Sequence, residues 1–205
     1  MKLAKNCSAC YFTEINAENK RSEAEMIRAI RASLATALLM VLVACGSDSA
    51  PATYSAAPQF LSYDGPQVTQ VVVNKSDRLM FLLSDQTILK TYKIHLGNEP
   101  VGSKQFEGDG KTPEGIFFVD RFNPRSQYHL SVGINYPRPQ DTARAMSVGR
   151  KPGGDIFFHG RGPDGAAAAR ENKNDWTAGC IAVEDAEIEE IYAMLRTGTQ
   201  VVINP

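Results

Sequence analysis

A cysteine and a histidine are the residues of this sequence best suited to act together in chemistry. Cys180 follows Gly179, and His159 ends the apolar run from Ile156 to Phe158. A glycine before a nucleophile lets the backbone bend, so that the thiol points into a cleft and nearby N–H groups face a developing oxyanion. A histidine at a strand end can hold the thiolate. The pair therefore predicts a thiol nucleophile, Cys180, and its base, His159.

The other cysteines strengthen this prediction. The sequence has four cysteines, of which Cys7 and Cys10 lie in a polar leader and Cys45 is a candidate for lipidation. Cys180 is then the only thiol of the folded part, which can have no internal disulfide. Such a thiol is either a small apolar core residue or is used in chemistry. Cys7 and Cys10 lack a second pair of ligands, so they do not indicate a zinc or redox site.

The remaining histidines and glycines indicate no cofactor. His95 lies in an alternating strand, which favours a structural role, whereas His129 lies beside Tyr128 and could line a cleft. The histidines and Cys180 form no short ligand pair, so we predict no metal site. The glycines of 108–115 lack the Gly-Lys-Ser/Thr ending of a phosphate-binding loop.

The composition predicts one ordinary globular domain. The chain has 205 residues, of which 43% are hydrophobic, enough for one buried core. Its 22 basic and 23 acidic residues give a net charge of -1, so no long-range field attracts nucleic acid or an anionic membrane surface. We therefore expect no nucleic-acid partner, and we expect a monomer.

The N-terminal region is typical of a bacterial lipoprotein signal. From Met26 a basic start leads into a short apolar stretch, and Leu42-Val43-Ala44-Cys45 fits a lipobox in which Cys45 is lipidated. The alternative is a plain secretory signal cleaved near Ala44. Residues 1–25 have mixed charge and no apolar pattern. We therefore expect translation to start at Met26 and the signal to span residues 26–45.

Residues 46–66 are predicted to be a flexible tether, because their first part is rich in Ser, Ala and Pro. The tether leads to a folded domain at residues 67–205. The residue directly after Cys45 is Gly46 and not an aspartate, and this favours the outer membrane over the inner one. The expected location is the periplasm, where the lipid anchor holds the domain at a membrane. If the signal is a plain secretory one, the domain is instead soluble, in the periplasm or secreted.

The folded domain is predicted to be β-rich. Runs of β-branched and apolar residues predict six strands: Val68–Asn74, Arg78–Leu83, Thr87–Leu96, Gly115–Asp120, Asp155–His159 and Gln200–Ile203. Apolar residues recur at helical spacing in Glu184–Arg196, the only predicted helix. The segments 97–114, 121–150 and 160–179 are predicted to be irregular. The predicted fold class is mainly β, or β-rich α+β: a mixed β-sandwich with one packed amphipathic helix near its C-terminus.

Three motifs resemble the catalytic domain of the L,D-transpeptidases (YkuD-type), and the resemblance covers roughly Gln67 to Ile203. In chain order they are Gly108-Asp109-Gly110-Lys111-Thr112-Pro113-Glu114-Gly115, Phe157-Phe158-His159-Gly160 and Asp175-Trp176-Thr177-Ala178-Gly179-Cys180-Ile181-Ala182-Val183. The resemblance implies that Cys180 is the nucleophile and His159 the general base. It also implies that Gly160, Thr177 and Gly179 shape the pocket.

Two departures from the family pattern concern the substrate. Ala178 stands where the family usually has His, and Ala182 where it usually has Arg, whereas Thr177 keeps the hydroxyl of the usual Ser. Recognition of substrate carboxylates is therefore expected to fall to other residues. The candidate substrate-binding residues are Arg161, Trp176, Arg150, Arg125 and Tyr128.

The resemblance implies a cysteine-dependent acyltransferase of peptidoglycan, active without metal or organic cofactor. The thiolate would attack the carbonyl between diaminopimelate and D-alanine in a tetrapeptide stem, and an amine would resolve the thioester during cell wall biogenesis or remodelling. If water resolves the thioester, the enzyme is an L,D-carboxypeptidase or hydrolase. Two alternatives stay open, a non-catalytic lipoprotein that binds peptidoglycan and a thiol peptidase of unrelated fold.

Overall fold

The computed structural model describes residues 57–171 and 174–205. The expectations for the leader, the signal and Cys45 lie outside the described residues. Within residues 57–171 and 174–205, no helix is long and apolar enough to cross a bilayer. Eight strands form one mixed sheet in the order β3-β2-β1-β8-β4-β5-β6-β7.

The first three strands form an antiparallel meander. They are β1 (Gln70–Asn74), β2 (Leu79–Ser84) and β3 (Thr87–Lys93). Buried and half-buried residues alternate along β1 and β2, as expected for strands that cover a core with one face. The three predicted strands at the start of the domain are thus confirmed.

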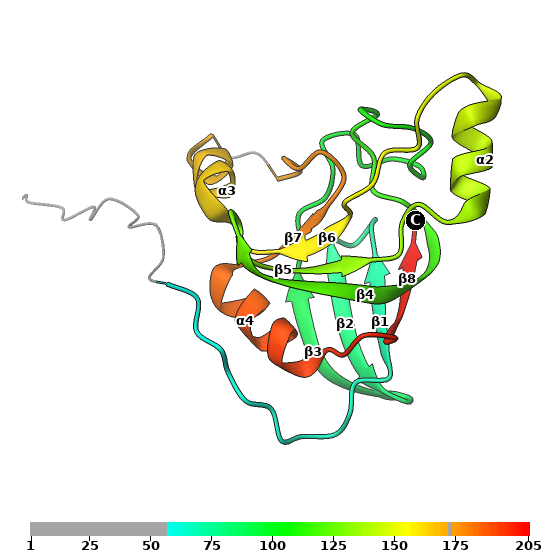
Figure 1. The fold of residues 1–205 in the computed structure, drawn as a ribbon. Helices are drawn as coiled ribbons and strands as arrows, with labels where there is room; N and C mark the ends of the chain where they lie inside the picture. Colours follow the sequence, from blue (N-terminus) through cyan, green and yellow to red (C-terminus); the bar gives the residue numbers. More distant parts are fainter. Residues whose placement is uncertain (1–56, 172–173) are drawn as a thin grey trace, which may run out of the picture. The chain divides into compact units, whose positions relative to one another are not determined.

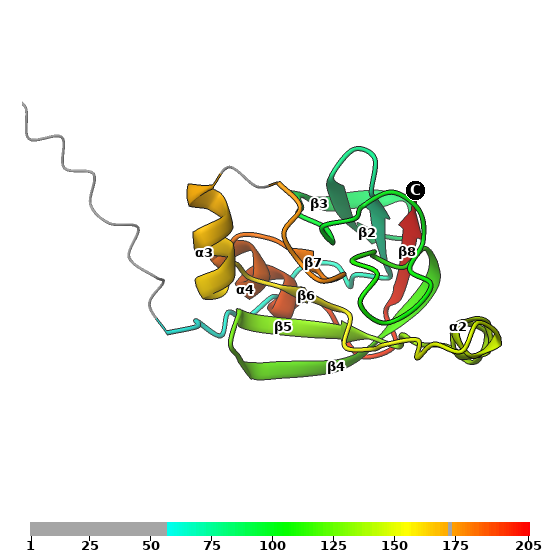
Figure 2. The same cartoon turned by 90° about the horizontal axis from the view of Figure 1, so that it is seen from above.

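The last strand, β8 (Gln200–Asn204), lies in the middle of the sheet. It runs parallel to β1 on one side and antiparallel to β4 (Gly115–Ser126) on the other. The first residues of β4 pair with β8, and its later residues pair with β5 (His129–Ile134). Because β4 belongs to both halves, the sheet folds into two layers that face each other (Figures 1 and 2).

Two short strands complete the second layer and carry the candidate catalytic residues. β6 (Phe157–His159) runs antiparallel to β5 and parallel to β7 (Ile181–Ala182), and this pairing sets His159 opposite Ala182. Cys180 is the residue immediately before β7. The sheet therefore brings the two motifs to neighbouring strands.

The predicted C-terminal helix is confirmed as α4 (Asp185–Met194). Its side chains Ile188, Ile191 and Met194 are buried, and the helix packs against β5 and β6. In both views it lies between the two layers, on the side away from β8 (Figures 1 and 2). The helix thus closes the core that the sheet leaves open on that side.

The prediction of a single helix is wrong, because the segments expected to be irregular contain two more. α2 (Pro139–Ser147) begins with a proline, which is compatible with the first helical position. α3 (Gly162–Arg170) has an aspartate in its first turn followed by a run of alanines, which are strong helix formers. Prolines and glycines therefore mark the start of these helices and do not exclude them.

The strand at residue 115 is also longer than predicted. β4 continues to Ser126 although it contains Pro124, because its pairing with β5 shifts register between Asn123 and Ser126. Such an irregularity tolerates a proline that a regular central ladder would exclude. The mainly-β class is confirmed.

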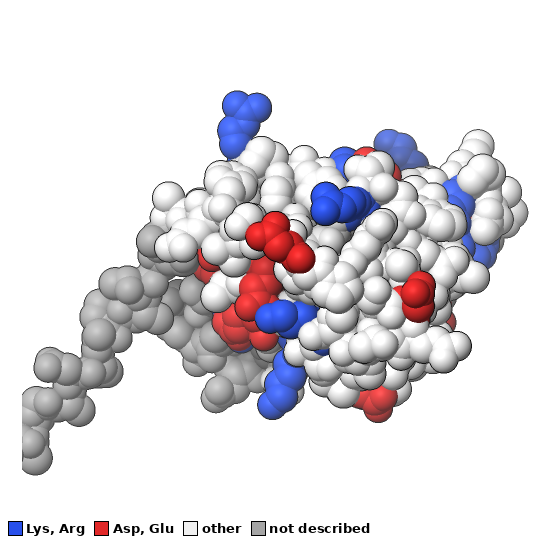
Figure 3. All heavy atoms as spheres, turned by 90° about the horizontal axis from the view of Figure 1, so that it is seen from below, with Lys and Arg blue, Asp and Glu red and all other residues white. Residues whose placement is uncertain are grey.

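Charged side chains of both signs are interspersed on the face seen from below (Figure 3). Among the described residues, an ion pair of this kind joins β3 to α4, with Lys90 Nζ 2.9 Å from Glu190 Oε2. This mixture agrees with the net charge of -1.

Candidate active site

A tight turn presents Cys180 at the start of β7. The Thr177 hydroxyl donates to the carbonyl of Cys180 at 2.8 Å and accepts the N–H of Gly179 at 3.1 Å. Gly179 has φ +137, a conformation that other residues rarely adopt. Thr177 therefore fixes the turn, and Gly179 allows it.

Replacing Gly179 with alanine is expected to lower the free energy of unfolding by about 1–3 kcal/mol, the usual cost of a strained backbone position. A Cβ at Gly179 would lie 2.7 Å from the Lys111 carbonyl, so the turn must also move and displace Cys180. Urea denaturation measures the loss. Gly198→Ala is the matched control, because Gly198 has φ +90 but no atom within 4 Å of its Cβ position. Equal losses in the two variants would contradict the role of the Lys111 contact.

The Cys180 thiol is held against the backbone before β6. Its Sγ donates to the Asp155 carbonyl at 3.3 Å. Asp155 has φ +55, which is uncommon for a residue with a side chain and is often found beside functional sites. Burial raises the pKa of the Cys180 thiol to about 11. The thiol is therefore neutral in the resting protein, and a group that accepts its proton would activate it.

His159 is suited to accept that proton. The ring is buried, and its Nδ1 lies 2.6 Å from the Gly160 carbonyl. Because a carbonyl only accepts hydrogen bonds, Nδ1 carries the proton and Nε2 has a free lone pair. Burial lowers the pKa of His159 to about 4, although the Gly160 carbonyl, Asp164 and Asp185 act in the opposite direction. The imidazole is thus neutral at pH 7, and no imidazolium holds a thiolate in the resting site.

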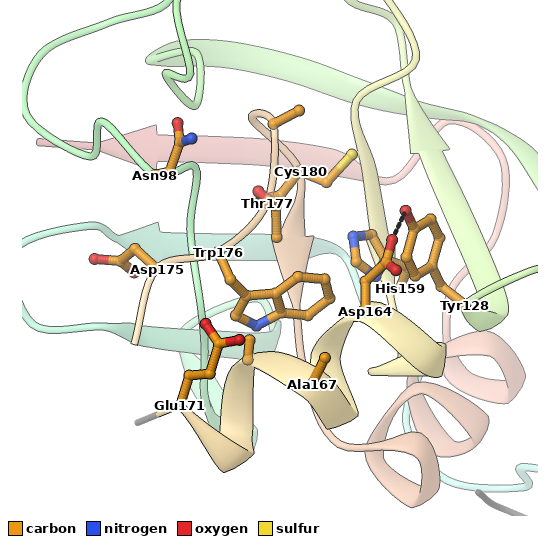
Figure 4. Close-up of a pocket in the computed structure, with 12 residues that line it drawn as sticks. Asn98, Tyr128, His159, Asp164, Ala167, Glu171, Asp175, Trp176, Thr177 and Cys180 are labelled. Atoms are coloured by element: carbon orange, nitrogen blue, oxygen red, sulfur yellow. Dashed lines mark hydrogen bonds between the residues drawn. The ribbon is translucent and has the colours of Figure 1, made fainter. Parts of the chain in front are cut away.

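Two aromatic rings hold the imidazole in place. The Tyr128 ring lies 4.6 Å from the His159 ring between centroids, and the Trp176 ring lies 5.7 Å away at 70°. The Tyr128 hydroxyl donates to Asp164 Oδ2 on α3 at 2.9 Å (Figure 4). The ring of His159 is therefore held between a strand turn on one side and the cysteine turn on the other.

A cavity of about 740 Å³ joins these groups. Figure 4 shows the Cys180 sulfur and the His159 ring at the same cavity, with α3 forming one wall. Its lining consists of Asn98, Tyr128, His159, Asp164, Ala167, Ala168, Glu171, Asp175, Trp176, Thr177, Ala178 and Cys180. Two smaller cavities, of about 400 and 480 Å³, also reach Cys180. Cys180 thus borders three cavities, two of which His159 also lines.

The structure separates the candidate substrate-binding residues. Tyr128 and Trp176 line the main cavity, and Arg125 lines the 480 Å³ cavity beside Cys180. Arg161 and Arg150 line none of the three cavities at Cys180.

Both of these arginines are engaged elsewhere. Arg161 donates to Glu184 Oε2 at 2.6 Å and lines a separate cavity with His95. The Arg150 guanidinium lies 4.1 Å from the centroid of the Phe106 ring.

The two remaining histidines lie outside the main cavity. His95 Nδ1 contacts the Asn174 carbonyl. Its Nε2 lies 3.2 Å from Arg161 Nη2. His129 does not line a cleft, because its ring is buried with Nε2 2.8 Å from Glu189 Oε1. Across residues 57–171 and 174–205, no group of three or more His, Cys, Asp or Glu side chains could hold a metal ion.

Several residues of the site are not predicted by any motif in the sequence. Asn98, Asp164 and Glu171 line the main cavity, and the backbone carbonyl of Asp155 accepts the hydrogen bond of the Cys180 thiol. A helix prediction at 162–170 would have placed Asp164 near the motifs, because its first turn follows His159 closely.

The two departures from the family pattern have different surroundings. Ala178 is exposed and lines the main cavity, whereas Ala182 is fully buried and pairs with His95. Only the change at residue 178 therefore alters the cavity wall.

A family match points to an enzyme domain of the transferase or peptidase class. Residues 69–203 match the family described as the L,D-transpeptidase catalytic domain (YkuD). The match covers most of the chain, and the protein belongs to this family.

Two relatives show how the chain compares with longer proteins. YafK of Escherichia coli (strain K12), provisionally named an L,D-transpeptidase, is 29% identical over 120 residues, which are 58% of this chain and 41% of YafK. The crystal structure of Pgp2 from Campylobacter jejuni, a helical cell shape determining protein, is 28% identical with a TM-score of 0.51. That match covers 73% of this chain and 51% of Pgp2. The chain therefore matches about two fifths to one half of the length of these relatives.

Proposed function

We propose that this protein is a cysteine-dependent L,D-transpeptidase of peptidoglycan that acts in cell wall biogenesis or remodelling. It transfers the acyl group of a tetrapeptide stem through a Cys180 thioester to an amine. The observation that carries the proposal is the placement of Cys180 and His159 at one cavity, with Nδ1 of the histidine already occupied by the Gly160 carbonyl. The family membership and the likeness to a cell shape determining protein support the choice of substrate.

The reaction begins with proton transfer. His159 Nε2 accepts the proton of Cys180 as the sulfur attacks the carbonyl between diaminopimelate and D-alanine. The Gly179 N–H is already bound to Thr177, so we assign the N–H of Cys180 as a donor to the oxyanion. His159 then returns the proton to the amine of D-alanine, which leaves as the thioester forms.

The second half reaction mirrors the first. A neutral amine attacks the thioester carbonyl and gives one proton to His159, and the thiolate leaves and takes that proton back. Tyr128 and Trp176 offer flat apolar surfaces beside the reacting atoms, and Arg125 offers a cation for a stem carboxylate. No step requires a metal or an organic cofactor.

Hydrolysis by the same site is the second candidate function. Three cavities reach Cys180, so water can approach the thioester from a side that the acceptor amine does not fill. The enzyme would then act as an L,D-carboxypeptidase. The ratio of transfer product to hydrolysis product distinguishes the two functions.

The experiment incubates the full chain with disaccharide tetrapeptide, with and without an amine acceptor, and uses the Cys180→Ala variant as the blank. D-Alanine release and an adduct that maps to Cys180 are expected from the wild-type protein. A free D-amino acid, a second stem or a lysine peptide as acceptor then identifies the amine from the product formed. Binding of tetrapeptide without adduct or release would contradict the enzyme and support a peptidoglycan-binding lipoprotein.

We also propose that the domain works in the periplasm, anchored to the outer membrane by a lipid on Cys45. The lipobox and the Ser/Ala/Pro-rich tether support this location. Labelled palmitate in cells expressing the full chain should appear on Cys45. A cleaved product without label would instead indicate a soluble periplasmic protein.

A further inference from the structure

The peptide group between Gly160 and Arg161 is engaged on both sides. Its carbonyl accepts the Nδ1–H of His159 at 2.6 Å, and its N–H donates to Asp185 Oδ1 at 2.8 Å. Because a trans peptide is planar, its C=O and N–H point in opposite directions. Fixing the N–H therefore fixes the direction of the carbonyl that holds the imidazole.

Several contacts make this peptide group rigid. A Cβ on Gly160 would lie 2.4 Å from Asp185 Oδ1 and 2.9 Å from the Tyr128 carbonyl, so only glycine lets the carboxylate approach. Asp185 is the first residue of α4, whose buried face is packed in the core. On the other side of the peptide, the Arg161 side chain is tied to Glu184 at 2.6 Å. The carboxylate thus acts from a fixed element.

We propose that Asp185 is a positioning residue that acts on His159 through this single peptide group, as a carboxylate–peptide–imidazole chain. The inference rests on the proposed role of His159 as the base. Hydrogen bonds in series polarise one another, so the negative charge on Asp185 makes the Gly160 carbonyl a stronger acceptor. When His159 takes the proton of Cys180, this carbonyl stabilises the imidazolium. The proton stays on Nδ1 throughout, and only Nε2 gains and loses one.

The other charged and titratable groups around His159 do not occupy this position. Cys180 faces the ring across the cavity, and Tyr128 stacks on the ring and donates its hydroxyl to Asp164. The Arg161 cation is paired with Glu184. Among the described residues, Asp185 is the carboxylate that reaches Nδ1 through an unbroken series of hydrogen bonds.

The test uses Asp185→Asn in the full chain, because an amide oxygen can still accept the Arg161 N–H but has no charge. The reaction of Cys180 with iodoacetamide is followed across pH, and peptide mapping separates it from the reactions of Cys7, Cys10 and Cys45. Loss of the charge is expected to slow alkylation at pH 7 about five- to tenfold, the difference between a charged and a neutral hydrogen bond. The rates should converge at alkaline pH, where the thiol ionises without help from the imidazole.

The matched control is Glu187→Gln, which removes the same charge from the same first turn of α4. Glu187 accepts the backbone N–H of Glu184 and not that of Arg161, so its alkylation profile should follow that of the wild type. The Nδ1–H proton resonance of His159 provides a second readout, and it should move upfield in Asp185→Asn only. Unchanged alkylation in Asp185→Asn, or equal slowing in both variants, would overturn the proposal.

These readouts do not involve peptidoglycan. Absence of D-alanine release from the wild-type protein would reject the proposed function and leave the alkylation result standing. A normal release by Asp185→Asn with an unchanged alkylation profile would reject the role of Asp185 and leave the function standing.

Discussion

Replacing His159 with asparagine is expected to slow acylation of Cys180 about 100- to 10,000-fold, the usual contribution of a general base. The thiol is neutral because burial raises its pKa to about 11, so without a base only a small fraction of it is a reactive thiolate at pH 7. Quenched-flow measurement of D-alanine release at saturating tetrapeptide gives the rate. His95→Asn is the control, because the same substitution at a histidine outside the main cavity should change the rate only a few-fold. A His159→Asn rate within a factor of ten of the wild type would contradict a base role.

The pH dependence of the wild-type rate follows from the same two groups. The imidazole must be neutral to accept a proton, and its pKa is about 4 because the ring is buried. Acylation should therefore increase as pH rises through about 4 and stay level through neutral pH. It should fall as pH rises through about 11, because loss of the thiol proton leaves none for the departing amine. An acid limb near the ordinary histidine value of about 6.5 would contradict the burial of the ring.

Replacing Asp109 with alanine is expected to lower the free energy of unfolding by about 3–5 kcal/mol, because it leaves a buried cation without its partner. The side chains of Asp109 and Lys104 are each 4% exposed, and Lys104 Nζ lies 2.8 Å from Asp109 Oδ1. Burial alone would raise the pKa of Asp109, but hydrogen bonds from Lys104 and from the N–H groups of Gln105, Phe106 and Lys111 outweigh it and lower the pKa. Urea denaturation measures the loss. A loss below about 1 kcal/mol would contradict the role of the pair.

A double-mutant cycle tests the coupling within this pair. Lys104→Met combined with Asp109→Asn removes both charges, so the double variant should be more stable than the sum of the single losses predicts. Simple additivity would show that the two side chains act independently. The outcome also bears on activity, because Lys104 and its loop line the 400 Å³ cavity beside Cys180.

The residues with the strongest local signal were the ones that could be predicted from the sequence. The alternation in β1 and β2 and the apolar stripe of α4 specify their own secondary structure, because each must bury one face. The motifs around His159 and Cys180 could also be predicted, because each contains a glycine that allows a turn next to the reactive residue. The structure places both residues at one cavity. α3 was missed because alanines supply helix propensity without a marked apolar stripe.

The support of the imidazole could not be predicted in this way. The ring of Tyr128 meets His159, and the carboxylate of Asp185 meets the N–H of Arg161, through contacts between separate elements of the chain. No local pattern in the sequence reports such contacts, because they arise only when β5, β6 and α4 pack together. For the same reason, the sequence does not show which arginine reaches the site. Arg125 lines a cavity beside Cys180, whereas Arg150 stacks on Phe106.

The central place of β8 has a consequence for how the domain is made. Residues 200–204 pair with β1 on one side and β4 on the other, so the two layers lack their connecting strand until the last part of the domain has been synthesised. Pairing of β1 with β8 also spans most of the domain's length, and contacts between such distant residues form slowly. Ribosome-bound chains that lack residues 200–204 should therefore hold at most the separate β1–β3 and β4–β7 pairings, and the complete sheet forms once the whole domain has been released.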